Sequence, residues 1–200
     1  MSFVWKNLAT GRNLAVLGAA LLLAIGVATT MMLRQDNLNK TLFRAARDGD
    51  KAGILDALKL GAHLSARDPL GQTPLHSVSY RGNADTVMLL VQQGAALNAR
   101  DKRGGTPLHW AVINGRVENV KLLLERGADP DVQDMVGMTP MHWAVTAMKI
   151  NDYTKAYNVR LLLDHKANPD VRDARGKTAL DYAEQKHNLL VAEMLGEVAK

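Results

Sequence analysis

The residues Thr-Pro-Leu-His occur more than once in this chain, at a fixed spacing. They stand at Thr73–His76 and Thr106–His109, and a close variant, Thr-Pro-Met-His, stands at Thr139–His142. These copies begin 33 residues apart in both cases, and a weaker copy, Thr178–Asp181, begins 39 residues after the third. A period of this length predicts a stack of supersecondary units, because one such unit cannot bury its apolar face alone.

Turn residues recur with the same period. Each repeated unit opens with an aspartate and has a glycine three residues later; these are Asp68, Asp101, Asp134 and Asp173, followed by Gly71, Gly104, Gly137 and Gly176. Further glycines follow the first helix expected in a unit (Gly49, Gly82 and Gly115) and the second (Gly61, Gly94 and Gly127). Threonine caps helices and proline fits their first turn, whereas glycine accepts the left-handed conformation that ends them. The pattern therefore marks two helices in each unit.

The period and these motifs together resemble the ankyrin repeat, over residues 38–198. The resemblance implies an all-α repeat solenoid of five helix pairs joined by β-hairpin fingers. Its units would start near Leu38, Asp68, Asp101, Asp134 and Asp173. The resemblance also implies that His76, His109 and His142 hydrogen-bond the finger backbone, and that partners contact the finger tips and the concave face of the first helices.

Several positions depart from the repeat pattern. The first unit has Lys40–Phe43 in place of the motif, and the last lacks its proline and histidine, so we interpret both as caps of the stack. Lys166 stands where a glycine is expected after the second helix, which leaves the geometry of that turn open. The longer step to the last motif places six additional residues in the fourth unit, within Met148–Asn158.

An apolar segment precedes the repeats. Residues Leu14–Leu33 carry no charge, and 20 residues of helix span about 30 Å, the thickness of the hydrocarbon core of a bilayer. We predict a basic tail (1–13), a transmembrane signal anchor (14–33), a linker (34–40) that reaches about 25 Å when extended, and the repeat domain (41–198). A cleaved signal peptide and a buried core helix are the alternatives, but the run is longer than the usual core of a signal peptide.

The bases on either side of the apolar segment bear on which side of the membrane the repeats occupy. The tail carries Lys6 and Arg12 and no acid, which favours the periplasmic or exterior side for the repeats, whereas four bases close behind the segment favour the opposite side. We expect the exterior side, because folded domains translocate with little regard for their charge. Ala20, Ala24 and Ala28 form a row of small residues that would permit contact with a second membrane helix.

Charge and cysteine content limit the possible functions. The chain has no cysteine, which excludes disulfides and thiolate metal sites. Residues 34–67 carry seven bases and four acids, whereas residues 68–200 carry 16 of each, so no basic stripe runs along the stack and we predict no nucleic-acid partner. The basic first unit is either a solvated cap or a surface attracted to anionic headgroups.

We find no motif of a catalytic, cofactor or metal site. His63, His165 and His187 have no partner at ligand spacing. Gly104 and Gly105 belong to a repeat turn rather than to a phosphate-binding loop, and the acids recur as turn and cap residues. We therefore predict a protein that is not an enzyme and holds neither cofactor nor metal.

A candidate partner surface lies in the third and fourth units. Met135, Val136 and Met138 occupy finger-tip positions, where exposed apolar side chains are costly unless a partner covers them. Trp110 and Trp143 follow the motif histidines; the family commonly has leucine there, packed between helices, so core packing is the favoured interpretation and exposure to the groove the alternative. Residues expected on the same side are Tyr80 and Ile113, and the insertion contributes Tyr153 and Tyr157.

The leading hypothesis is a single-pass membrane protein whose repeats hold a partner protein at the membrane. The alternatives are a periplasmic or secreted binder whose first segment is cleaved, and a non-catalytic accessory subunit of a membrane complex.

Overall fold

The repeats form a row of helix pairs beside one long helix. The computed structural model describes residues 11–81 and 83–198, with side-chain environments for residues 18–81 and 83–197. The helices are α1 (Gly11–Asp48), α2 (Lys51–Lys59), α3 (Pro74–Arg81), α4 (Ala84–Gln92), α5 (Pro107–Ile113), α6 (Val117–Glu125), α7 (Pro140–Thr146), α8 (Asp152–Asp164), α9 (Ala179–Gln185) and α10 (Leu189–Val198). The all-α repeat solenoid predicted from the sequence is confirmed. Gly82 lies outside the described residues.

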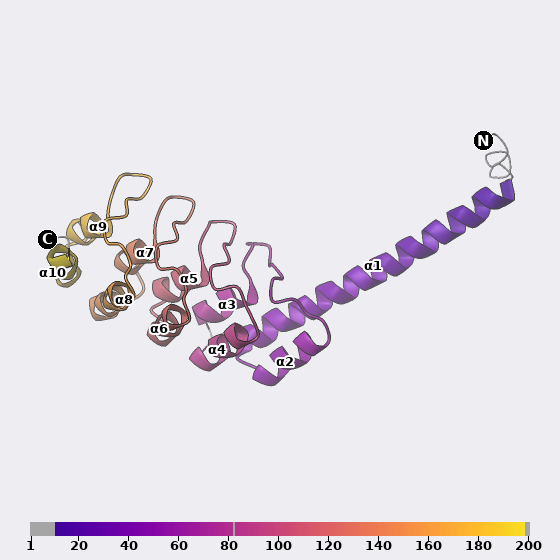
Figure 1. The fold of residues 1–200 in the computed structure, drawn as a ribbon, viewed down its shortest axis with the longest axis horizontal. Coiled ribbons are helices and arrows are strands. Elements are labelled where there is room, and N and C mark those ends of the chain that lie inside the picture. Colours follow the sequence, from indigo (N-terminus) through magenta and orange to yellow (C-terminus); the bar gives the residue numbers. More distant parts are fainter. Residues whose placement is uncertain (1–10, 82, 199–200) are drawn as a thin grey trace.

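The helices form two layers (Figure 1). The C-terminal part of α1 and helices α3, α5, α7 and α9 are the first helices of the five units, and α2, α4, α6, α8 and α10 are the second helices. The core between the layers repeats with the units: each first helix of units one to four buries one large side chain, and each second helix buries another. These residues are Leu42, Leu75, Leu108 and Met141 in the first layer and Ile54, Leu90, Leu123, Leu162 and Leu195 in the second.

The loops before α3, α5, α7 and α9 all project to the same side of the stack (Figure 1). We call them the fingers of units two to five and number each finger by its unit. The third finger thus precedes α5, the fourth precedes α7 and the fifth precedes α9. Each finger is a tight turn, closed by a backbone hydrogen bond such as that from the Asp101 N–H to the Gly105 carbonyl, 2.9 Å. Adjacent fingers share one backbone hydrogen bond, for example from the Met135 N–H to the Arg103 carbonyl, 2.9 Å. The β-hairpins that we expected are not confirmed: the described residues contain no strand, because one bond between fingers makes no ladder.

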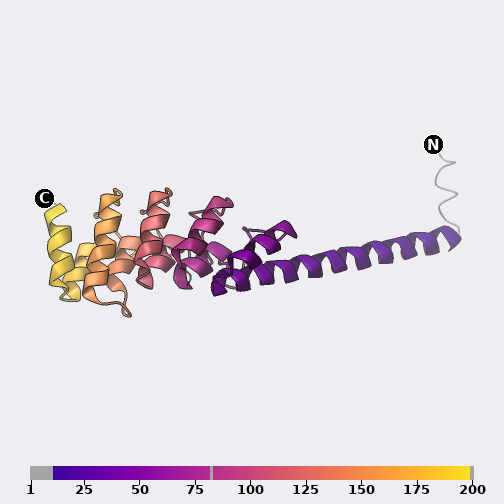
Figure 2. The ribbon, with the colours of Figure 1, turned by 90° about the horizontal axis from the view of Figure 1, so that it is seen from below.

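Helix α1 passes without a break from the apolar segment into the first unit. Residues 34–40, predicted to be a linker, are helical, and the region from Leu33 to Arg44 contains neither glycine nor proline. The Gln35 amide donates to the Gly61 carbonyl at 2.8 Å, and the Asn39 amide oxygen accepts from the His63 N–H at 2.9 Å. These bonds fasten α1 to the end of α2. Figure 2 shows the rest of α1 extending away from the stack.

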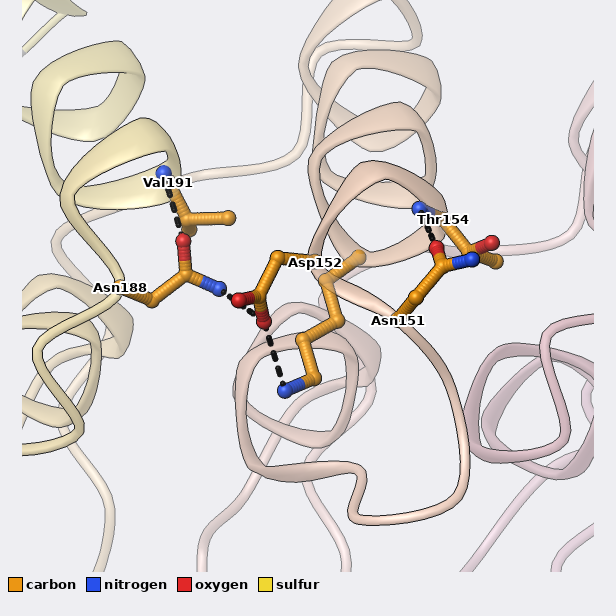
Figure 3. Close-up of polar contacts among 6 residues, drawn as sticks. Asn151, Asp152, Thr154, Asn188 and Val191 are labelled. Atoms are coloured by element: carbon orange, nitrogen blue, oxygen red, sulfur yellow. Dashed lines mark hydrogen bonds and ion pairs between the residues drawn. The ribbon is translucent and has the colours of Figure 1, made fainter.

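The extra residues of the fourth unit lengthen one helix. The loop between α7 and α8 has five residues where the loop between α5 and α6 has three, and α8 has 13 residues where α6 has nine. Asn151 caps α8 by accepting from the Thr154 N–H at 2.8 Å. Asp152 accepts from the Asn188 amide of the fifth unit at 2.9 Å and from Lys155 at 3.1 Å (Figure 3). The insertion is therefore fastened to the last unit.

Lys166 keeps the turn that glycine makes in the other units. Its φ is 65°, and the Ala167 N–H donates to the Leu162 carbonyl at 3.0 Å, as the Ala128 N–H does to Leu123 at 2.9 Å. A side chain in this conformation costs about 1–2 kcal/mol, whereas a glycine loses about 0.5–1 kcal/mol more in chain entropy on folding.

We expect Lys166→Gly to raise the free energy of unfolding by about 0.5–1 kcal/mol, measured by urea denaturation in mild detergent. Lys121→Gly, inside α6, is the control and is expected to lower it by about 1 kcal/mol. A loss of stability in both variants would mean that the Lys166 turn is not strained.

Candidate partner-binding surface

The fingers owe their positions to the motif histidines. The Nδ1 atom of His109 lies 3.1 Å from the Thr106 backbone nitrogen, whose N–H it must accept, so its Nε2 carries the proton and donates to the Met138 carbonyl of the next finger at 3.2 Å. His76 and His142 make the corresponding bonds to the Gly105 and Lys177 carbonyls, at 3.2 and 3.1 Å. Each ring thus connects a helix cap to the neighbouring finger.

Burial holds His109 in this neutral form. The ring is completely buried, and burial lowers its pKa from 6.5 to about 4, although the bond to the Met138 carbonyl acts in the opposite direction. Burial also lowers the pKa of His76. Protonation of His109 at Nδ1 would remove the acceptor of the Thr106 N–H.

The opening aspartate of a finger uses both carboxylate oxygens. Oδ1 of Asp134 accepts from the N–H groups of Val136 and Met138, both at 2.9 Å, and Oδ2 accepts from the Trp143 indole at 3.0 Å. The same arrangement recurs with Trp110 on Asp101 at 2.9 Å, and with the Tyr182 hydroxyl on Asp173 at 2.6 Å. The two tryptophans are therefore structural residues that brace the fingers, and each remains half-buried.

Partly exposed aromatic rings run along the first helices. Tyr80 and Trp110 have centroids 5.6 Å apart, and Trp110 and Trp143 have centroids 5.9 Å apart, all in edge-to-face contact. These edge-to-face pairs favour a fixed ring arrangement. The tryptophan rings are thus packed against each other and half-buried, and Trp143 also lines a hollow beside the fingers.

A hollow of about 400 Å³ lies between the fourth finger and the first helices. We call it the apolar hollow. Five of its lining residues were predicted for the partner site: Ile113, Met135, Val136, Met138 and Trp143. Arg103, Asp134 and Thr146 line it as well. Met135 and Val136 are 75% and 56% exposed, whereas Met138 is half-buried, so only two of the three finger residues are as exposed as expected.

A second hollow, of about 670 Å³, adjoins the first. Val136, Met138 and Thr146 line both, so the fourth finger separates them. We call it the basic hollow because Arg175, Lys177 and Lys186 are among its lining residues. Burial alone would raise the pKa of Asp173 in its wall, but hydrogen bonds from Tyr182 and the backbone lower it, so this carboxylate is charged and already occupied.

The inserted residues of the fourth unit lie away from both hollows. Tyr157 lines a shallow groove between α6 and α8 with Val117 and Lys121, in the layer of second helices, and Tyr153 is 82% exposed on the same helix. Ile150 packs beside Gly115: a Cβ atom added to Gly115 would lie 2.6 Å from the Cγ2 atom of Ile150. The structure does not bring Tyr153 and Tyr157 to the apolar hollow, since the extra residues lengthen a second helix.

The predicted site residues do not include the bases around the hollows. Arg103 is a finger-tip residue, Arg175 lies in the fifth finger and Lys186 directly follows α9, so their place in the repeat puts them beside the predicted site. The charge count along the chain concealed them, because acids elsewhere in the same units cancel them. In the described part of the chain, no group of three or more histidine and acidic side chains could hold a metal ion.

Comparison with known families assigns the repeats. The family model described as ankyrin repeats in three copies matches residues 42–134, and the model for a single ankyrin repeat matches residues 136–174. The chain belongs to the ankyrin repeat family, as its motifs suggested. A search among curated proteins found no matching sequence.

The buried histidine makes stability depend on pH. Because the pKa of His109 is lower in the folded state, the unfolded chain takes up the proton first as the pH falls from about 6.5 to 4. We expect stability to be full above pH 6.5 and to fall by about 3 kcal/mol across that range from this residue alone.

Urea denaturation at several pH values measures the effect. His109→Gln removes the titration, so its stability should vary less with pH, whereas the exposed His63→Gln should keep the pH dependence of the natural chain. Equal slopes for His109→Gln and the natural chain would contradict the assignment.

Proposed function

We propose that the chain is a membrane-anchored scaffold that holds a partner protein against the fingers and first helices of its repeats. Ankyrin repeats are suited to protein–protein interaction, and the observation that carries the partner site is the apolar hollow. Met135 and Val136 expose most of their apolar surface there, beside Trp143. Solvent-exposed apolar patches of this kind are covered when a partner binds.

Helix α1 supports the anchor. Its stretch from Gly18 to Asp48 contains a window with mean hydropathy 1.4, long enough to cross a bilayer, and none of that window is buried. Leu22, Leu23 and Met32 are 72%, 73% and 76% exposed, which favours lipid over water around them. The same facts disfavour a core helix. A cleaved signal sequence has these properties as well, and the repeats would then form a soluble periplasmic binder.

The continuous helix would give the anchor a second property. Since α1 enters the first unit without a flexible linker and is bonded to α2 through Gln35 and Asn39, the stack would stand at a fixed angle to the membrane. We place the repeats on the exterior side. Ala20, Ala24 and Ala28 are exposed on α1. Contact with a second membrane helix through these residues stays a prediction.

The anchor is tested by the fate of the first segment. We expect the protein to resist extraction by alkaline carbonate, to keep its N-terminal residues when sequenced, and to give an active exterior reporter when one is fused after Lys200. A mature chain that starts near Thr29 would exclude the anchor in favour of the cleaved binder.

The partner site is tested by capture. The variant Met135→Ser, Val136→Ser, Met138→Ser removes the apolar wall and should weaken recovery of partners by photo-cross-linking in membranes by about tenfold. Tyr153→Ser, on the exposed face of α8, is the matched control and should leave recovery unchanged. Unchanged thermal unfolding would show that the stack is intact. Recovery lost only in the control would place the site on the second helices.

A further inference from the structure

Bases and acids are distributed differently in the fingers than in the whole chain. The four fingers, taken as residues 67–72, 100–105, 133–138 and 172–177, carry seven bases: Arg67, Arg100, Lys102, Arg103, Arg172, Arg175 and Lys177. Their only acids are the four opening aspartates, of which Asp101, Asp134 and Asp173 have both oxygens hydrogen-bonded. Three of the seven bases, Arg67, Arg100 and Arg172, donate to backbone carbonyls of the fingers. The fingers therefore carry more bases than acids, and most of their acids are already hydrogen-bonded within their own units.

The other layer holds the paired charges. Of the six ion pairs in the described residues, five lie on second helices: Lys51–Asp85, Lys59–Asp56, Lys121–Glu125, Lys155–Asp152 and Arg160–Asp164. The sixth, Lys40–Asp36, lies on α1. Arg103, Arg175 and Lys186 have no carboxylate within 4.0 Å in the described chain. The equal count of acids and bases therefore conceals a separation by face.

Membrane headgroups are too far away to compensate this charge, given the proposed anchor. Arg44 and Arg47 follow the apolar segment by 11 and 14 residues of the same helix, or about 16–21 Å if the helix stands upright. The screening length at physiological salt is about 8 Å. The fourth and fifth units, whose residues line the hollows, lie farther along the stack from α1 (Figure 2). A soluble or protein-borne anion is needed to reach them.

The order of the fingers favours a peptide over a nucleic acid. The third finger carries Lys102 and Arg103, and the fifth carries Arg175 and Lys177. The fourth finger, between them, has no base and exposes Met135 and Val136. A phosphate backbone requires positive charge along its whole path. Here an apolar centre interrupts the bases on both sides.

We propose that the partner presents an acidic segment with one large apolar side chain, which enters the apolar hollow while carboxylates on either side face Arg103 and the bases Arg175 and Lys186 of the basic hollow. The inference rests on the proposed function and adds the chemistry of the partner. Unpaired bases at the rim would accelerate encounter and make binding sensitive to salt, while the apolar contact would supply most of the affinity.

Peptide selection on the intact protein tests the inference. The full chain is placed in nanodiscs of phosphatidylcholine, which lacks net charge, and a random library of 16-residue peptides displayed on phage is selected against it. We expect the enriched peptides to share aspartate or glutamate on both sides of a Leu, Ile, Met, Phe or Trp. Their affinity, measured by fluorescence anisotropy, should fall as salt increases.

Two matched double variants separate local charge from total charge. Arg175→Gln with Lys186→Gln should weaken these peptides by about five- to tenfold and reduce their salt dependence. Lys59→Gln with Lys121→Gln removes the same charge from the second helices, where the side chains are 75% and 58% exposed, and should have no effect. Equal weakening by both pairs would overturn the inference.

The outcomes distinguish the inference from the function on which it rests. If the selected peptides lose binding in the double variant Met135→Ser, Val136→Ser but contain no acidic residues, the acidic partner is overturned and the binding site stays in place. Peptides unaffected by that variant would contradict the site itself. Comparable binding of a 20-residue oligothymidylate, weakened by Arg175→Gln with Lys186→Gln, would overturn the acidic peptide in favour of a nucleic acid.

Discussion

The hydrogen bond from a motif histidine to the finger of the next unit is the contact on which the rest of the surface depends. His76, His109 and His142 each donate to a finger carbonyl at 3.1–3.2 Å and accept from the threonine that starts their own helix. The ring therefore fixes the finger relative to a helix of the neighbouring unit. Because the walls of both hollows are fingers on one side and first helices on the other, the shape of the hollows follows from these bonds.

Much of this arrangement could be predicted from particular residues, and the rest depended on contacts that a period does not contain. The repeated motif predicted the units and the place of Met135 and Val136 at a finger tip. It did not predict the bonds of Gln35 and Asn39 that fasten the helical residues 34–40 to the end of α2. Nor could it say whether the six additional residues form a loop or lengthen α8, which decides the position of Tyr157.

The distribution of charge over the surface could not be predicted from the sequence either. Counted along the chain, residues 68–200 have equal numbers of acids and bases. In space, five acids of the second helices pair with nearby bases, and Asp101, Asp134 and Asp173 are hydrogen-bonded within their own units. Within the described residues, Arg103, Arg175 and Lys186 have no carboxylate within 4.0 Å. A surface that is apolar at its centre and basic at its rim results from a sequence that is neutral over the same residues. The proposed anchor and this surface together would give a scaffold that presents one face at a fixed angle to the membrane.

Cysteine accessibility in native membranes tests the central claim most directly, because the chain has no cysteine of its own. Single variants Val136→Cys and Arg175→Cys report on the two hollows, and Lys121→Cys reports on the second helices. If the hollows hold a partner, the first two will react slowly with a maleimide in native membranes and rapidly after purification, while the third will react at the same rate in both. Protection of Lys121→Cys alone, with free reaction at both hollows, would contradict the account.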